Sequence, residues 1–529
     1  MSAELPTRRS RRRCWTRQAF VAVPGGPALL LAASLAAPSV LLAGCAVGPD
    51  FHRPGYADAT HRAPGRYNET APDAVTVASK VAGGEAQHLV VGRDIPGEWW
   101  QLFRSPAITT LVATALRDSP SIDAANAALR VAQEQAMAQQ GTLFPQIDGT
   151  ISRSRQEEPL SLEGSQSPPL LFSDYSAGLT LSYTLDFWGG LRRAVEQAEA
   201  QVDYQRYQLE AAYLALSAGV ANSAILAASL QGQIAVQQQL IGFEQKQLDT
   251  VRQQFELGGA TGTDVATQQA QVAEAQTTLV PLQTERVQTR DQLASYLGQA
   301  PSGVVIPALD LDSLTLPGEL PVSVPSALLA QRPDIRAAEA NLHQQTAALG
   351  VAISMRLPNV TLTASVGSSA ADTHQLFSPT NGMWSLVNQA VQPIFDAGQL
   401  LHKQRAQKAA MQQAAAQWRN TVVQAFQNVA DVLAAVQNDA VALNYAVIAQ
   451  TAAARSLSLA SLQYKLGGVS YLSVLTAQQT YQNTVITLIR ARAARFTDSI
   501  ALYQALGGGW WNRNDLPPPP PGLFSSPLP

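Results

Sequence analysis

Cysteine is almost absent from this chain. Its 529 residues include two cysteines, Cys14 and Cys45, and Cys14 lies inside a cluster of arginines near the N-terminus. A structural disulfide is therefore nearly excluded, and Cys45 needs another explanation. Charged residues are also scarce, at 14% of the chain against about 25% in an ordinary globular protein. Alanine and glutamine are abundant instead, a composition that suits long helices packed closely through small side chains.

The residue patterns of catalytic and metal-binding sites are missing too. The six histidines have no paired spacing on a helix and no nearby cysteine, which argues against a metal site. The segment GGATGTD from Gly258 lacks the Gly-Lys-Ser/Thr ending of a phosphate-binding loop and joins two predicted helices. No GxSxG nucleophile motif is present. We therefore expect no enzymatic activity and no metal.

The first 44 residues have the three parts of a secretory signal. Six arginines precede an apolar stretch over residues 28–43, and a small-residue junction follows. The junction Leu42-Ala43-Gly44-Cys45 resembles the lipobox of bacterial lipoproteins, whose cysteine is acylated and becomes the first mature residue. Ala46 follows where an aspartate would otherwise stand, which by resemblance to sorted lipoproteins favours the outer membrane. An ordinary signal peptide or an uncleaved anchor remains an alternative.

Loss of this signal would change the charge of the chain. Residues 1–44 carry six arginines and one glutamate, so their removal takes the formal charge from −3 to −8. No basic surface is then left to suggest a nucleic-acid partner.

The chain contains an internal repeat. At an offset of 209 residues, QFELGGATGTDVATQQ from Gln254 matches QYKLGGVSYLSVLTAQ from Gln463. Further upstream, the offset becomes 213. The chain is therefore interpreted as a tandem duplication of residues 107–298 and 325–507. The change of offset predicts a loop four residues shorter in the second copy, between Pro358 and Gly398.

Each copy is predicted to begin with a helix, over residues 121–143 or 334–355, which a proline ends. After the proline, apolar residues recur at every second position, which predicts strands over residues 147–152, 179–187 and 360–366. A fourth strand, from Trp384 to Phe395, is weaker because Asn388 and Gln392 interrupt its apolar face.

These strands have one apolar and one polar face. With lengths of about 9 to 11 residues, they fit a transmembrane β-barrel. The two-residue alternation by itself fits a strand of a soluble sandwich equally well. Four strands are too few to close a barrel, and the flanking helices are too long for a sandwich.

Two very long helices follow the strands. No proline interrupts residues 191–256, and neither proline nor glycine interrupts residues 399–466, so each helix extends for about 100 Å. Each stops at a Leu-Gly-Gly sequence, and a second helix returns to Leu297 or Leu506. A 4,3 spacing of apolar residues predicts a coiled-coil seam at Val422, Phe426, Val429, Leu433, Val436, Ala440 and Leu443. A solvent-exposed two-stranded coiled coil acting as a spacer is the alternative.

Four segments together resemble the outer-membrane factors of bacterial tripartite efflux pumps, in their lipoprotein branch. They are CAVGPDFHRP, EWWQLFRSPAITTLVATAL from Glu98, QPIFDAGQL from Gln392 and the tip sequence FELGGATGTDV. The resemblance implies an α+β membrane protein that forms a homotrimer. Each subunit gives four strands to one twelve-stranded barrel in the outer membrane, and long helices continue it as a tunnel across the periplasm. Apolar strand residues then face lipid and polar ones face a water-filled lumen.

The function implied is that of an exit duct. It passively conducts small molecules that an inner-membrane efflux pump delivers through a periplasmic adaptor protein. The resemblance implies no cofactor besides the covalent lipid on Cys45, which is a supplementary anchor in outer-membrane lipid. The alternatives are a lipid-anchored helical scaffold without a pore and an outer-membrane protein linked to type I secretion.

The resemblance also divides the chain. Residues 1–44 are the signal, 45–106 a lipid-anchored N-terminal segment, and 107–298 the first repeat. Residues 299–324 are a linker in the equatorial region, 325–507 the second repeat, and 508–529 a tail rich in glycine, tryptophan and proline.

The Leu-Gly-Gly turns are the predicted contacts with the adaptor, because they lie at the far periplasmic tip. These residues are Leu257, Gly258 and Gly259 and their copies Leu466, Gly467 and Gly468. Simple helix capping explains the glycines equally well.

A gate is predicted beside these turns. The resemblance places a gating aspartate at Asp264 and its tyrosine partner at Tyr464, as a polar latch between the two copies. Where relatives often carry acidic rings or a latch arginine, this chain has Ser473, Thr476 and Val469. Leu472 could instead form an apolar ring that excludes water, unless it is buried in the seam between helices.

Overall fold

The computed structural model describes residues 46–55, 58, 59, 67, 73–158 and 170–513. The chain divides into two compact units, Met1–Cys45 and Ala46–Pro529, and the fold below is that of the second unit. The signal sequence, Cys45 and residues 514–529 of the tail lie outside the described residues.

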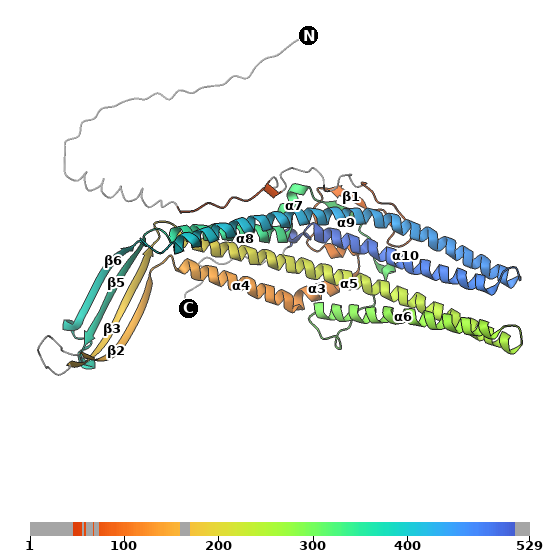
Figure 1. The fold of residues 1–529 in the computed structure, drawn as a ribbon, viewed down its shortest axis with the longest axis horizontal. Coiled ribbons are helices and arrows are strands. Elements are labelled where there is room, and N and C mark those ends of the chain that lie inside the picture. Colours follow the sequence, from red (N-terminus) through yellow and green to blue (C-terminus); the bar gives the residue numbers. More distant parts are fainter. Residues whose placement is uncertain (1–45, 56–57, 60–66, 68–72, 159–169, 514–529) are drawn as a thin grey trace, which may run out of the picture. The chain divides into compact units, whose positions relative to one another are not determined.

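Two copies of one element order make up this unit (Figure 1). The first copy runs through helices α3 (Pro106–Asp118) and α4 (Pro120–Gly141), strands β2 (Gln146–Glu158) and β3 (Leu170–Leu185), and helices α5 (Gly190–Glu256) and α6 (Gly262–Tyr296). The second runs through α7 (Pro325–Gln331), α8 (Pro333–Ser354), β5 (Asn359–Ala370), β6 (Gly382–Val391), α9 (Gln399–Lys465) and α10 (Tyr471–Ala505). The predicted α+β class and the tandem duplication are confirmed.

The four long strands form one antiparallel sheet in the order β2-β3-β5-β6. They contain 13, 16, 12 and 10 residues, so three of them are longer than the predicted 9 to 11. The second strand begins at Leu170, well before the predicted Leu179, and ends at Leu185. The fourth ends at Val391. Ile394 and Phe395 therefore lie beyond it, about 90% exposed.

The prediction of a shorter loop in the second copy is wrong. The described strands leave at most residues 159–169 for the connection in the first copy, which is no longer than residues 371–381 in the second. The second copy instead has shorter strands and a longer passage from β6 to α9, residues 392–398. Sequence spacing gives only the sum of these lengths, and hydrogen bonding between strands decides where each strand stops.

Both long helices begin in the same way. Gly189 precedes α5 with φ +73°, and Gly398 precedes α9 with φ +82°, a left-handed conformation that suits glycine. An aspartate then caps each helix: Asp186 accepts from the backbone N–H groups of Leu191 and Arg192, and Asp396 from those of Gly398 and Leu400. Backbone N–H donation from Leu400 lowers the pKa of Asp396.

The largest buried cluster of the unit contains two notable features. Along α9, the predicted seam is buried at all positions except Phe426, which is partly buried. Beside it, Trp99, Phe103, Phe496 and Tyr503 form an aromatic cluster in which the Trp99 and Tyr503 rings stack 5.5 Å apart. The short parallel pair β1 (His88–Val91) and β4 (Glu319–Val322) joins the N-terminal segment to the linker between the repeats.

Two helices meet the length and composition of a membrane span. They are α5 and α9, in which 44% and 28% of the apolar window is buried within the subunit. Long helices packed in a core pass the same test, and both helices pack against neighbouring helices, α5 on α4, α6, α8 and α10 and α9 on α8 and α10.

Candidate functional site

The sheet has two chemically different faces. One carries Ile147, Ile151, Leu179, Leu181, Leu362, Ala364, Val366, Trp384 and Leu386, which the strand register brings together. The other carries Asp148, Thr150, Ser152, Thr180, Ser182, Thr361, Thr363 and Ser365. Hydroxyl pairs bridge neighbouring strands on this polar face, with Ser152 and Ser176 oxygens 2.7 Å apart and Ser365 and Ser385 oxygens 2.8 Å apart. Such a sheet separates an apolar medium from water.

Two tyrosines bound the apolar face along β3. Tyr175 and Tyr183 lie on this face eight residues apart, which at about 3.3 Å per residue is about 26 Å. The apolar band of a transmembrane barrel is about 25 Å tall and has aromatic girdles at both edges. Because strands in such barrels are tilted by about 35 to 45°, this length corresponds to a rise of about 20 Å, so the two tyrosines lie close to the edges of such a band.

The sheet is open at both edges in the subunit. β2 and β6 are its outer strands, and every residue of β6 is exposed. Long unpaired edges attract another strand, so this sheet is built to pair with further copies. As predicted, β6 alternates poorly, because Asn388 faces Leu362 on the apolar side and Val387 lies on the polar side.

The Leu-Gly-Gly turns end α5 and α9 with the same hydrogen bonds. Gly259 N donates to Gln254 O over 2.7 Å, and Gly468 N donates to Gln463 O over 2.8 Å. Gly258 and Gly467 have φ values of +78° and +74°. This is a Schellman cap, so capping alone explains the glycines. It does not explain Leu257 and Leu466, which are 87% and 78% exposed.

The predicted bond between Asp264 and Tyr464 is not formed within the subunit. Asp264 instead belongs to a capping box at the start of α6, where its carboxylate accepts from Thr261 N over 2.8 Å and from Thr261 Oγ1 over 2.7 Å. These two donors lower the pKa of Asp264. The ring of Tyr464 packs against that of Tyr471, with 5.5 Å between centroids. Local capping competes for the carboxylate, and the sequence pattern does not reveal that competition.

An exposed stripe runs along α10. It consists of Leu472, Thr476, Thr480, Asn483 and Thr487, spaced three or four residues apart. All are polar except Leu472, which is 63% exposed and lies at the tip. Leu472 is therefore not a seam position within the subunit. Val474 and Leu475 are buried there instead. Ser473 is also exposed, beside the helix cap Ser470.

Sequence reasoning missed the polar contacts that join the two repeats. Arg490 of α10 donates to Gln233 of α5 over 2.9 Å. Next to this bond, a side chain at Gly232 would meet Ile489 at 3.5 Å, so the helices are close there. Nearer the tip they enclose a cavity of about 150 Å³ whose lining includes Gln237, Glu244, Gln271, Gln479 and Asn483. Isolated glutamines inside helices give no sequence signal for such contacts.

A buried carboxyl group lies in this region. Glu244 is 6% exposed and accepts from Gln268 Nε2 of α6. Burial raises the pKa of Glu244. The buried hydroxyl of Tyr471, on the second repeat, has no hydrogen-bond partner among the described residues, and burial followed by the charge of Glu244 raises its pKa. The tip half of the helices thus holds polar groups in a poorly hydrated place.

Sequence reasoning also missed a cluster of buried polar groups around Arg495. This arginine is fully buried and donates to Thr76 Oγ1, Glu85 O and Gln87 Oε1 of the N-terminal segment, the last over 2.8 Å. Burial, then the nearby Asp439, raises the pKa of Asp498 to about 7. The N-terminal segment is therefore fastened to α10 by buried polar bonds.

The residues that follow Cys45 are also held. Val47 N donates to Trp188 O over 2.9 Å, and Arg193 donates to Val47 O and pairs with Asp50. The hydrogen bond from Arg193, followed by its charge, lowers the pKa of Asp50. Ala46 lies so close to Gly189 that a side chain there would meet Ala46 Cα at 2.6 Å. The start of the described chain is therefore fixed where β3 passes into α5.

No group of three or more histidine, cysteine, aspartate or glutamate side chains suited to a metal occurs in the part of the chain that the structure describes.

Residues 111–299 and 324–508 match the sequence model of the outer membrane efflux protein family. The chain is 29% identical over 436 residues to the pyoverdine export outer membrane protein OpmQ of Pseudomonas aeruginosa, covering 81% of this chain and 91% of OpmQ. It is 30% identical over 481 residues to the probable efflux pump outer membrane protein TtgC of Pseudomonas putida, covering 90% and 95%. The open state of the MtrE outer membrane channel of Neisseria gonorrhoeae matches with a TM-score of 0.73 and 26% identity, over 88% of this chain and 99% of MtrE.

Proposed function

The chain belongs to the outer membrane efflux protein family and is an outer-membrane efflux channel; we propose that three copies form the conduit and that molecules cross it passively. The observation that carries the proposal is the open four-stranded sheet with one apolar and one polar face. Three such sheets, joined from β6 of one copy to β2 of the next, make a barrel of twelve strands. A barrel of that size is wide enough for a water-filled interior.

We propose that the wall of this conduit carries no specific substrate site. The polar sheet face and the stripe on α10 carry mainly hydroxyl and amide groups, which interact weakly with many solutes. The choice of substrate then belongs to an inner-membrane pump, and a periplasmic adaptor connects the two. A scaffold without a pore would not need a continuous polar sheet face.

Conductance across a planar lipid bilayer tests the conduit. Purified full-length protein is expected to migrate as a trimer and to insert with uniform conductance steps, small in the wild type and larger in a variant opened at the tip. A matched preparation from cells without the gene is the control. If opened variants of the purified trimer give no steps, the protein is not a channel.

We propose that Cys45 carries a lipid that anchors the mature chain. The LAGC sequence supports it, and so does the fixed position of Ala46 beside Gly189. Ala46, the residue after Cys45, is held where β3 passes into α5, which suits an anchor that holds this part of the chain on the membrane. Each buried methylene contributes about 0.8 kcal/mol to such anchoring.

Replacing Cys45 by Ser is expected to abolish acylation and to leave the trimer intact, because the barrel spans the membrane without the lipid. Mass spectrometry of the mature N-terminus measures the first effect, and native gel electrophoresis of outer-membrane extracts measures the second. Replacing Cys14 by Ser is the control and should change neither. An unmodified amine on any residue other than Cys45 in the wild type would contradict the anchor.

A further inference from the structure

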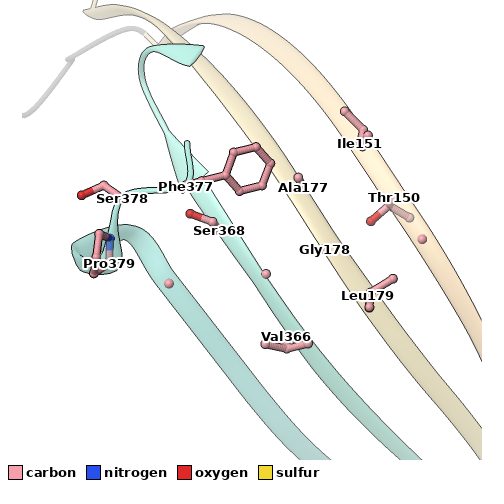
Figure 2. A pocket seen from close by; sticks show the side chains of 13 residues that line it. Thr150, Ile151, Ala177, Gly178, Leu179, Val366, Ser368, Phe377, Ser378 and Pro379 are labelled. Atoms are coloured by element: carbon pink, nitrogen blue, oxygen red, sulfur yellow. The ribbon is translucent and has the colours of Figure 1, made fainter. Parts of the chain in front are cut away.

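The apolar face of the sheet has a groove beside the connection between β5 and β6 (Figure 2). The groove holds about 690 Å³, within the range of about 300 to 1,000 Å³ found for small-molecule sites. Its floor is low because Gly149 and Ala177 have little or no side chain, while Ile151, Leu179 and Val366 rise around them.

The connection between β5 and β6 forms one wall of this groove. Ser368, on the apolar face, donates to Asn381 O over 2.9 Å and also to Leu376 O. These bonds hold the connection over the apolar side of the sheet, where the ring of Phe377 points toward Ala177 in Figure 2. Phe377 is 81% exposed, so the wall itself offers apolar surface to whatever occupies the groove.

Two arginines stand above the groove on the same face. Arg153 and Arg155 follow Ile151 along β2 at intervals of two residues, which keeps them on its side of the sheet. Both are exposed, and neither forms an ion pair within the described part of the chain. Glu157 lies further out on this face. The guanidinium of Arg153 lies 5.4 Å from the ring centre of Tyr175.

The heights of these groups match the layers of a membrane. Arg153 pairs in register with Tyr175, the tyrosine at the outer edge of the apolar band, where lipid headgroups lie. Gly149 and Ile151 lie two to four residues lower, about 7 to 13 Å along the strand, which is about 5 to 10 Å in depth for a strand tilted by about 35 to 45°. Cations at headgroup height above an apolar groove suit a molecule with an anionic head and an acyl chain, because guanidinium groups bind phosphate with two parallel hydrogen bonds.

We propose that this face binds a phosphorylated, acylated lipid of the outer leaflet, with one acyl chain in the groove and a phosphate on Arg153 and Arg155. The proposal rests on the outward orientation of the apolar face in the proposed barrel and on no property of the pump or adaptor. A trimer presents three such sites to the surrounding lipid, and lipid bound there shields the charge of both arginines.

Native mass spectrometry of the full-length protein in detergent tests the site, with diphosphorylated hexa-acyl lipid A as the probe. The double variant Arg153→Ser with Arg155→Ser is expected to bind lipid A at least about ten-fold more weakly than wild type. The double variant Arg405→Ser with Arg419→Ser removes the same charge from exposed positions on α9 and should bind as wild type does. Equal binding by wild type and the β2 variant would overturn the proposal.

Two further measurements separate the groove from a simple anion site. Ala177→Phe fills the groove and should weaken binding, whereas Ala364→Phe lies on the same sheet face outside it and should not. Dephosphorylated lipid A should bind weakly, and 10 mM inorganic phosphate should not displace the intact lipid. Displacement by phosphate, or no effect of filling the groove, would reject a lipid site. Bilayer conductance of the same variants should equal that of wild type, which keeps a failure here distinct from a failure of the channel.

Discussion

Replacing Leu472 by Ser is expected to raise the single-channel conductance of the purified protein several-fold. Leu472 is the one apolar side chain on the exposed stripe of α10, it lies at the tip, and it is 63% exposed in the subunit. If the stripes of three subunits line the tunnel, three copies of Leu472 meet near the axis. An apolar constriction closes a pore by excluding water, and a hydroxyl at that position admits it.

The same variant should also admit large antibiotics. Cells that carry Leu472→Ser are expected to become sensitive to vancomycin, which the intact outer membrane excludes. Leu462→Ser is the matched control, because Leu462 is a 55% exposed leucine on α9 near the same turn and lies off the stripe. Wild-type conductance and vancomycin resistance in the Leu472 variant would place the gate elsewhere.

The combined change of Asp264 to Ala and Tyr464 to Phe distinguishes an apolar gate from a polar one. The carboxylate of Asp264 is held by Thr261 in the capping box. Removing it should therefore loosen the first turn of α6 and change conductance less than Leu472→Ser does. A larger rise in conductance from this pair would mean that a polar latch, formed between subunits, closes the tip.

Replacing Gly468 by Trp is expected to abolish export while the trimer stays folded. Gly468 has an ordinary backbone conformation, and a side chain there meets only Gln463, with nothing closer than 3.5 Å. A Cβ is therefore accepted at this position, and because Gly468 is exposed, a larger side chain can extend into solvent. If the Leu-Gly-Gly turns contact an adaptor, a tryptophan blocks that contact, and cells should become as drug-sensitive as a strain without the channel.

Gly259→Trp provides the same test in the first repeat, since the nearest atom to a side chain there is Gln254 O at 3.6 Å. The measurements are minimal inhibitory concentrations of exported drugs, crosslinking to the adaptor, and trimer content on native gels. A control substitution at Gly242, an open position on α5, should leave export intact. Normal export and crosslinking in both tip variants would leave helix capping as the whole role of these turns.

Much of the fold could be predicted from the sequence because the responsible signals are local. Proline-free stretches predicted two very long helices, which the structure shows with 67 residues each; glycine pairs marked their ends, and a period of two marked the strands. These patterns reflect backbone conformation and side-chain alternation, which neighbouring residues determine. The internal repeat added a second copy of each signal, so that the weak fourth strand could be inferred from its better-patterned counterpart.

The site was less predictable because its geometry depends on distant residues. Asp264 and Tyr464 lie beside the Leu-Gly-Gly turns, but the carboxylate of Asp264 accepts from Thr261 and the ring of Tyr464 packs against Tyr471. Glu244, Gln233 and Arg495 lie inside unremarkable helical sequence. Only the packing of α6, of the second repeat or of the N-terminal segment against them makes them buried and polar partners.

By itself, the sequence determined the class of this protein: a duplicated chain with strands of membrane-crossing pattern and helices far longer than a globular core needs. Tertiary structure alone decided the lengths of the strands, the exposure of Leu472 and the alignment of two arginines above an apolar groove. The physical reason is that helix and strand formation follow from local backbone preference. Exposure and partnership depend on which surfaces the fold brings together.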